Sequence, residues 1–316
     1  MNLDRLSAYG GVGWSPRSEH LTDELGRIWA PYTVGSEWAQ LAAVLLHRPG
    51  QELQASHDPR QAQMLAPVDL ARARRQHDAL AAAYERAGVV VHRLDPQTLP
   101  PPNQMFVADL MFMTPEGAVV GRPASTVRAG EERFVARKLA ELGVPILRTI
   151  RGRGTFEGAD AMWIDARTVL VGVGFRTNTQ GAAQLAALLS EMAVTVVPVP
   201  LATGAMHLMG ALRIIAPDLA VAWPGRLALE AKEVLEQRGY EVCWIPDTDE
   251  ALHGMALNGV TMGERRVLLP AGNPRTQAFF EDLGVSVQTV AMDELAKAAG
   301  AIGCLTGILS RAADLP

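Results

Sequence analysis

The chain lacks the features that mark several large classes of protein. Its 316 residues include only two cysteines, too few for a disulfide framework, and neither lies in a C-x-x-C or cysteine–histidine pattern typical of zinc sites. The net charge is −5 and the basic residues form no block, so the positive surface of a nucleic-acid-binding protein is missing. No apolar run approaches the ~20 residues that span a bilayer. We therefore expect no metal or organic cofactor, no nucleic-acid partner and no membrane partner.

The first residues also lack the apolar core of a secretory signal peptide, which predicts a cytoplasmic location. The composition, with 48% hydrophobic and 20% charged residues, is typical of a globular protein that can bury a large core. The sequence leaves a homo-oligomer open.

A repeated arrangement of elements is the main positive feature of the sequence. After an irregular lead-in over residues 1–35, with one short helix expected at 18–28, the order strand, strand, helix, strand recurs five times at roughly 50-residue intervals. Four of the helices end close to a glycine, as left-handed C-caps predict. The expected helices span 68–86, 131–142, 180–192, 228–238 and 274–283, and the glycines are Gly88, Gly143, Gly239 and Gly284.

The strands expected around these helices are rich in β-branched and apolar residues. One such unit cannot bury its strand faces alone, but five units around an axis can. The sequence therefore predicts an α/β fold, a five-fold pseudosymmetric α/β-propeller of ββαβ units, built as a single domain over residues 36–316. A doubly wound sheet is the alternative fold, although no glycine-rich phosphate loop follows an early strand. The expected strands are 41–47, 89–94, 105–113, 118–122, 145–149, 161–164, 168–173, 195–199, 211–215, 220–223, 241–245, 259–262, 266–270 and 286–290.

Cys304 lies in the glycine-rich stretch Gly300–Gly307, where glycines allow the backbone to approach whatever the sulfur faces. The other cysteine, Cys243, lies in an alternating strand pattern and is expected to be a small core residue. A buried packing role is the alternative for Cys304 as well. Its setting, together with the residues described next, favours a catalytic nucleophile.

Polar residues interrupt the apolar background at the starts of other strands. Asp109 lies inside an apolar run, Glu157 and Asp160 open a later strand, and His207 lies between apolar residues. Turns and a hydrogen-bonded core histidine are the alternative explanations. However, Cys304, His207, Glu157 and Asp109 occupy equivalent places in different repeats, so the fold would bring them to one axis. Carboxylates there could hold a planar cation by paired hydrogen bonds, while a thiolate attacks its central carbon and histidine protonates the departing amine.

An ordered set of short motifs resembles the guanidine-modifying superfamily, which comprises arginine deiminases, dimethylarginine dimethylaminohydrolases and amidinotransferases. The resemblance runs from about residue 33 to 311, and the five-fold ββαβ ring of that family agrees with the repeat count. The matching segments are Ser36–Trp38, His47–Gly50, Asn103–Asp109, Phe156–Asp160, Gly174–Asn178, His207–Leu208 and Gly303–Cys304.

This resemblance implies a role for each candidate residue. Cys304 would be the nucleophile that forms a covalent S-alkylthiouronium, His207 the acid and base, and Glu157 the partner of His207 and a ligand of the guanidinium. Asp109 would be a second guanidinium ligand, and Arg176 would bind a substrate carboxylate. Surface or capping roles are the alternatives for the remaining polar positions. The further substrate-binding residues implied are Arg128, Asn103, Asp160 and Met209.

Two positions depart from the pattern of the family. Met209 stands where deiminases and glycine-type amidinotransferases usually carry Asp, and Ala108 stands where relatives often carry Arg or Glu. One guanidinium ligand is therefore missing, which favours a substituted guanidine, or one without the usual amino-acid head, over plain arginine.

The resulting hypothesis is a cysteine-dependent hydrolase that cleaves a C–N bond of a small guanidino compound. An amidinotransferase, which passes the amidino group to an amine, is the enzymatic alternative. A binding protein on the same fold, as in a translation factor that resembles it, is the non-enzymatic alternative, and it would lack the catalytic set.

Overall fold

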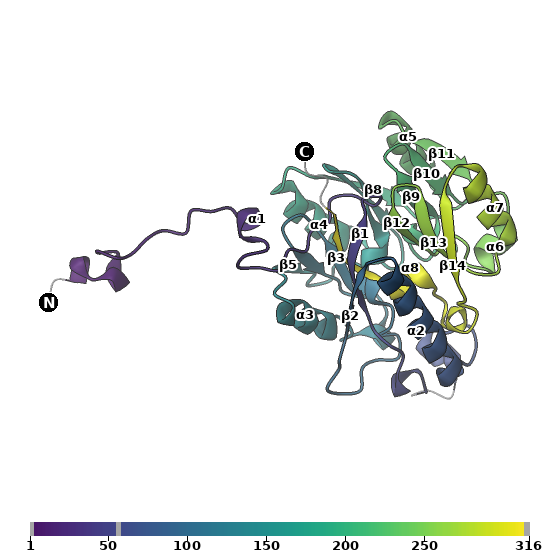
Figure 1. Cartoon of the computed structure of the whole chain (residues 1–316), viewed down its shortest axis with the longest axis horizontal. Coiled ribbons are helices and arrows are strands. Elements are labelled where there is room, and N and C mark those ends of the chain that lie inside the picture. The colour runs from purple at the N-terminus through teal and green to yellow at the C-terminus, as the bar shows by residue number, and fades with distance from the viewer. Residues whose placement is uncertain (1–2, 55–57, 313–316) are drawn as a thin grey trace.

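The computed structural model describes residues 3–54 and 58–312, and these residues form an α/β fold (Figure 1). None of the described helices is long and apolar enough to cross a membrane. The helices are α1 (Leu21–Glu24), α2 (Leu70–Arg86), α3 (Glu132–Glu141), α4 (Thr179–Ser190), α5 (Leu229–Gln237), α6 (Thr248–Leu252), α7 (Pro274–Asp282) and α8 (Ile302–Leu305). The strands are β1 (Leu41–Leu46), β2 (Val90–Arg93), β3 (Met111–Met113), β4 (Ala118–Val120), β5 (Ile146–Thr149), β6 (Ala161–Asp165), β7 (Thr168–Val173), β8 (Thr195–Pro200), β9 (Leu212–Ala216), β10 (Leu219–Ala222), β11 (Glu241–Trp244), β12 (Val260–Gly263), β13 (Arg266–Pro270), β14 (Ser286–Val290) and β15 (Gly307–Arg311).

Within the described ranges the strands form five three-stranded sheets of one topology. In each sheet the middle strand pairs antiparallel with one neighbour and parallel with the other. The parallel partner follows a helix, as a crossover connection requires. The sheets are β15–β1–β2, β3–β4–β5, β6–β7–β8, β9–β10–β11 and β12–β13–β14, and their crossover helices are α2, α3, α4, α5 and α7. The repeated unit predicted from the sequence is thus present, while closure of the units into a propeller stays a prediction because the sheets remain separate.

The first sheet joins distant parts of the chain. Its antiparallel strand is β15, which pairs with β1 through Leu41 opposite Arg311 and Val44 opposite Ile308. The first repeat read from the sequence has only two strands, and β15 supplies the third. Cys304 therefore belongs to the turn that leads into the first sheet.

Burial differs strongly among the three strands of a sheet. The middle strand β7 is buried along nearly its whole length, whereas the parallel strands β5 and β11 are exposed or half-buried at every position. Cys243 lies on β11, where it is half-buried and packs against the edge of an apolar cluster, so its expected place in the core is confirmed only in part. An alternating pattern predicts a strand, but it does not show whether that strand lies at an edge.

Two other expectations differ from the structure. The first half of the strand expected at 105–113 is a 3₁₀ turn, η5 (Val107–Leu110), and only β3 is extended. A buried turn and a buried strand have the same apolar composition, so the pattern cannot separate them. The helix expected at 18–28 is a single turn, α1, within a segment whose N-terminal part extends away from the body (Figure 1).

The expected C-caps lie where the helices end. Gly88, Gly143, Gly239 and Gly284 all have positive φ, between 72° and 84°. The helix without a glycine, α4, uses Ala193 at φ 57° for the same turn. The left-handed conformation costs a residue with a Cβ atom roughly 1–2 kcal/mol.

We expect Ala193→Gly to stabilise the protein by about 0.5–1 kcal/mol, because relief of this strain exceeds the added backbone entropy of glycine. Urea unfolding would measure the change in the free energy of unfolding. Ala187→Gly is the matched control, since Ala187 is an exposed residue inside the same helix, and it should be destabilising by about 0.5–1 kcal/mol. A loss of stability in both variants would contradict the account.

Candidate active site

Four short helical turns deliver the candidate residues, and each turn immediately precedes the antiparallel edge strand of a sheet. Asp109 lies in η5 before β3, and Cys304 lies in α8 before β15. Glu157 is the N-cap of η7 (Gly158–Asp160) before β6, and His207 is the N-cap of η8 (Leu208–Gly210) before β9. The structure therefore places all four in equivalent positions of different sheets.

Asp109, Glu157 and His207 form one buried cluster. His207 Nε2 lies 2.7 Å from Glu157 Oε2 and 3.9 Å from Asp109 Oδ1. Burial disfavours the imidazolium, but Asp109, Asp160 and Glu157 outweigh it and raise the pKa of His207 to about 9. Burial likewise opposes the charge of Glu157, yet the hydrogen bond with His207 and the nearby cations lower its pKa to about 2. The pair is thus imidazolium and carboxylate near neutral pH.

Arg128 neutralises the acids of this cluster. It is buried, and its Nη1 lies 2.6 Å from Asp109 Oδ2 and 3.4 Å from Glu157 Oε2. Its Nε and Nη2 both donate to Glu131 Oε2, at 2.9 and 2.7 Å. Burial works against its charge, but these acids still hold the pKa of Arg128 above its ordinary value. Asp109 Oδ1 has no hydrogen-bond partner among the described residues, so one carboxylate oxygen is left for a cation.

Arg176 and Asn103 line a small cavity that reaches Cys304. Arg176 Nη1 lies 3.5 Å from Glu157 Oε1, its guanidinium carbon lies 5.1 Å from the centre of the Phe175 ring, and its Nε lacks a partner in the described chain. Asn103 Nδ2 donates to the Ala62 carbonyl at 2.7 Å, while Asn103 Oδ1 is unpartnered among the residues described. Both residues therefore line a cavity at the thiol, and each keeps one buried polar atom without a partner in the described chain.

Asp160 and Met209 hold different positions from these polar residues. Asp160 is fully buried, and its Oδ1 accepts the Leu208 N–H at 3.1 Å. It lines neither the cavity of Arg176 and Asn103 nor a second cavity that Cys304 shares with His207. Burial raises its pKa to about 7, against the opposing effect of His207. It supports the turn that carries His207. The sulfur of Met209 packs against α8. It lies so close to Gly303 that a Cβ atom added to this glycine would be only 2.9 Å from it.

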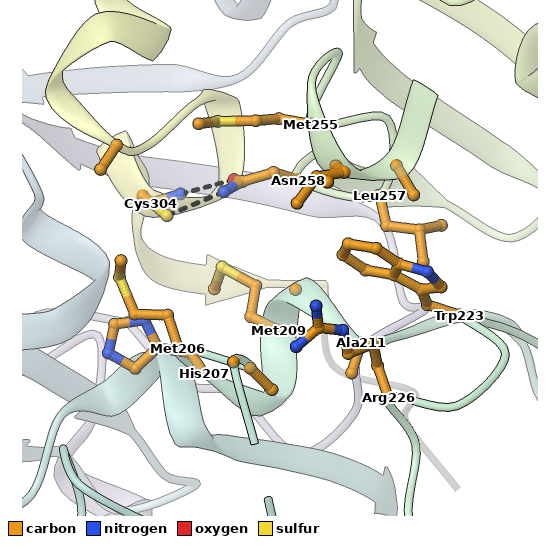
Figure 2. Close-up of a pocket in the computed structure, with 16 residues that line it drawn as sticks. Met206, His207, Met209, Ala211, Trp223, Arg226, Met255, Leu257, Asn258 and Cys304 are labelled. Atoms are coloured by element: carbon orange, nitrogen blue, oxygen red, sulfur yellow. Dashed lines mark hydrogen bonds between the residues drawn. The ribbon is translucent and has the colours of Figure 1, made fainter. Parts of the chain in front are cut away.

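Asn258 is a site residue that the sequence did not suggest. Its Nδ2 donates to Cys304 Sγ at 2.9 Å, and its Oδ1 accepts the backbone N–H of Cys304 at 3.1 Å (Figure 2). It lies two residues before β12, which is the place that Asp109 occupies before β3. The repeat itself was the available signal, because the last unit had no assigned polar residue.

The thiol of Cys304 is protonated near neutral pH. Burial and the nearby Asp109 raise the pKa of Cys304 to about 11, although the hydrogen bond from Asn258 lowers it. A cation that enters the site would favour the thiolate, as an opposite charge does within a few ångströms.

We expect Asn258→Leu to raise the pKa of the Cys304 thiol by at least about one unit, since a hydrogen bond to a charged group contributes about 1.5–3 kcal/mol. Alkylation of Cys304 by iodoacetamide at pH 8, followed by peptide mass spectrometry, should slow about tenfold or more because the thiolate is the reactive form. Cys243 in the same samples is the internal control. Equal alkylation rates of Cys304 in both proteins would show that Asn258 does not stabilise the thiolate.

By type and distance, Asp109, Glu157 and His207 could also hold a small cation, since their ligand atoms lie within 4.8 Å of one another. Arg128 and Arg176 already occupy several of the carboxylate oxygens. A planar cation that needs only the free lone pairs suits this arrangement better than a metal ion that needs the full set.

Comparisons with known proteins agree with the geometry. The family model described as N,N dimethylarginine dimethylhydrolase, eukaryotic, matches residues 53–306. The N(G),N(G)-dimethylarginine dimethylaminohydrolase of Pseudomonas aeruginosa is 28% identical over 242 residues, which cover 77% of this chain and 90% of that protein. The enzyme of the same name from Streptomyces coelicolor is 30% identical over 239 residues, covering 76% and 86%.

Solved structures give the same picture. A cysteine-to-serine mutant of the Pseudomonas aeruginosa enzyme in complex with citrulline superimposes with a TM-score of 0.71, at 25% identity, covering 84% of this chain and 98% of that one. An amidinotransferase from Microseira wollei shares the fold, with a TM-score of 0.73 at 15% identity, over 91% of this chain and 99% of that one. The resemblance to the guanidine-modifying superfamily is confirmed. The chain belongs to the N,N dimethylarginine dimethylhydrolase family, a family of guanidine-modifying hydrolases.

Proposed function

We propose that the protein hydrolyses a small substituted guanidino compound of the dimethylarginine class, with Cys304 as nucleophile and a covalent thiouronium as intermediate. One observation carries this proposal. Cys304 and His207 line the same cavity, and His207 is bonded to Glu157 behind it. A thiol and an imidazolium thus face one space, and an unpartnered oxygen of Asp109 lies 3.9 Å from His207 Nε2.

Binding and activation follow from the charges of the site. The guanidinium donates to the free oxygen of Asp109, and its positive charge lowers the pKa of the Cys304 thiol. The proton of the thiol passes to solvent water as the cation arrives. Arg176 and Asn103 hold the polar head of the substrate, and Asp160 keeps the His207 turn in place. Arg128 forms ion pairs with Asp109 and Glu157, so its role at substrate binding is indirect.

The reaction then proceeds in two balanced steps. The thiolate of Cys304 forms a C–S bond to the guanidinium carbon, and the C–N bond to the departing amine breaks as His207 gives that nitrogen a proton. Water next gives one proton to the neutral His207 and forms a C–O bond. The C–S bond then breaks to regenerate the thiolate and release the ureido product, and the second water proton passes through solvent to the departed amine. One guanidinium and one water thereby give one ureido product and one ammonium ion.

We also infer that the five sheets surround one axis as a propeller, formed by residues 36–316 as one catalytic domain. The support is a small cavity lined by at least one residue from the antiparallel edge strand of every sheet, for example the five named next. These residues are Met111, Met162, Arg213, Val260 and Ile308. A ring explains why the four catalytic turns, which belong to four sheets, reach one cavity.

A panel of guanidino compounds tests the function. Incubation with arginine, Nω-methylated arginines and simple alkylguanidines, followed by assays for ammonia, alkylamine and ureido products, should show release of an alkylamine with a ureido co-product. Formation of an amidino product only when an amine acceptor is supplied would point to amidino transfer instead. Release of no amine from any member would overturn the proposal.

A further inference from the structure

Two cavities that differ in their charged side chains meet at Cys304. One has Arg128 and Arg176 in its lining, with Gln63, Asn103 and several apolar residues. The other has a volume of about 140 Å³ and includes His207 but neither arginine of the first. The thiol therefore lies between a space that contains the two buried arginines and a larger space that contains neither of them.

The second cavity is built mainly from apolar side chains, most of which lie to one side of Cys304 and His207 (Figure 2). Three methionines contribute flexible thioether side chains, which adapt to ligands of different shape. Leu257 is buried on its far side, and Arg226 lies 5.0 Å from the centre of the Trp223 ring. The apolar residues that define it are Met206, Met209, Ala211, Trp223, Met255 and Leu257.

The backbone of Met255, which lines the second cavity, is strained. Met255 has φ 50°, in the left-handed region that residues with a Cβ atom rarely adopt. Such strain persists where the surroundings demand it, and it clusters at ligand sites. Its neighbour Asn258 donates its own N–H to the Met255 carbonyl at 2.8 Å, so the strained turn is tied to the residue that contacts the nucleophile.

The volume exceeds what a methylated guanidine needs. An apolar cavity of about 150 Å³ in another protein is large enough to bind benzene. Dimethylamine has only three heavy atoms, so it would leave much of this cavity unfilled, and dispersion contacts are lost across a gap.

Resting on the function proposed above, we propose that the substrates carry an apolar N-substituent of about the size of an aromatic ring, which this cavity holds and which leaves as an apolar amine. His207 lines the second cavity and not the cavity of the two arginines, so the nitrogen that it protonates faces the second cavity. When the C–N bond breaks, the imidazolium proton passes to that nitrogen, and the amidino carbon stays on Cys304. The remaining polar part of the substrate stays in the cavity of Arg176 and Asn103.

A pair of substrates with one head group tests this assignment. We expect kcat/KM for Nω-benzylarginine to exceed that for Nω-methylarginine by about tenfold or more, because the ring buries additional apolar area. The released benzylamine or methylamine is measured by chromatography. Each substrate has the same leaving group in every variant. A change between variants in the benzyl-to-methyl ratio of kcat/KM therefore reflects a change in the cavity.

Gly210 offers a way to fill this space. It lines the cavity, a Cβ atom added to it would meet no atom within 4 Å, and its φ is outside the left-handed region. Gly210→Leu should lower the benzyl-to-methyl ratio by at least about tenfold. Ala166→Leu is the matched control, since it adds the same atoms at an exposed turn outside the cavity, and it should leave both rates unchanged.

The results of these experiments distinguish a failure of the cavity assignment from a failure of the proposed hydrolase function. Turnover of the methyl substrate with no preference for the benzyl substrate, or a ratio unchanged by Gly210→Leu, would overturn the inference and leave the function standing. If neither substrate reacts, calorimetric binding of benzylguanidine to Cys304→Ser decides. Binding that Gly210→Leu abolishes would support the cavity assignment alone, and the absence of binding would overturn it together with the function.

Discussion

Cys304→Ser should lower kcat for every guanidino substrate by on the order of 10⁴-fold or more, because a serine hydroxyl is not ionised near neutral pH and loss of a nucleophile removes most of the catalytic set at once. The fold should survive, since the added change is one atom in a turn whose backbone bonds to Asn258 are unaffected. Amine release and circular dichroism measure the two effects. Retained turnover would refute the mechanism.

Cys243→Ser is the control for this experiment. Cys243 is half-buried on β11, at an edge of another sheet, so its replacement should leave catalysis intact. Mass spectrometry of wild type quenched during turnover should find the amidino adduct on the peptide that holds Cys304. His207→Gly should increase that adduct if His207 activates water in the second step, and an adduct on Cys243 would speak against the assignment.

The second large effect concerns stability. Arg128→Met should destabilise the protein by about 3–5 kcal/mol, because it leaves buried carboxylates without their cation. Arg128 is the shared partner of Asp109, Glu131 and Glu157. Urea unfolding at pH 7 measures the change. Arg137→Met is the control, because Arg137 forms an exposed pair with Glu141 on α3, and it should change stability by less than about 1 kcal/mol.

The loss of stability caused by Arg128→Met should depend on pH. Burial already raises the pKa of Glu131 to about 7, and loss of Arg128 removes the cation that opposes this shift. When the pKa of a carboxyl group is higher in the folded state than in the unfolded state, the free energy of unfolding falls as the pH rises through the folded-state pKa. The variant should therefore be closer to wild type at pH 5 than at pH 8. A deficit that is constant over this range would show that lost packing, and not charge, is the cause.

The repeated unit was predictable because each helix and its C-cap leave local signals. The expected helix at 274–283, for example, differs from α7 by one residue. The central cluster was predictable only as a convergence of equivalent positions. The partners of Arg128 could not be foreseen, since they lie on η5, η7 and the start of α3, and no local pattern links those segments. Asn258 was missed because asparagine before a strand is commonplace, and only its contact with the sulfur distinguishes it.

The pairing of β15 with β1 has a consequence for how the protein becomes active. Strands far apart in sequence pair late, because closing a long loop costs entropy before any contact repays it. The turn that carries Cys304 is fixed only when this pairing forms, so the thiol meets Asn258 after the other sheets can already exist. A chain refolding from denaturant should recover helical signal before it recovers catalysis. The recovery of enzymatic activity during refolding would then show when β15 pairs with β1.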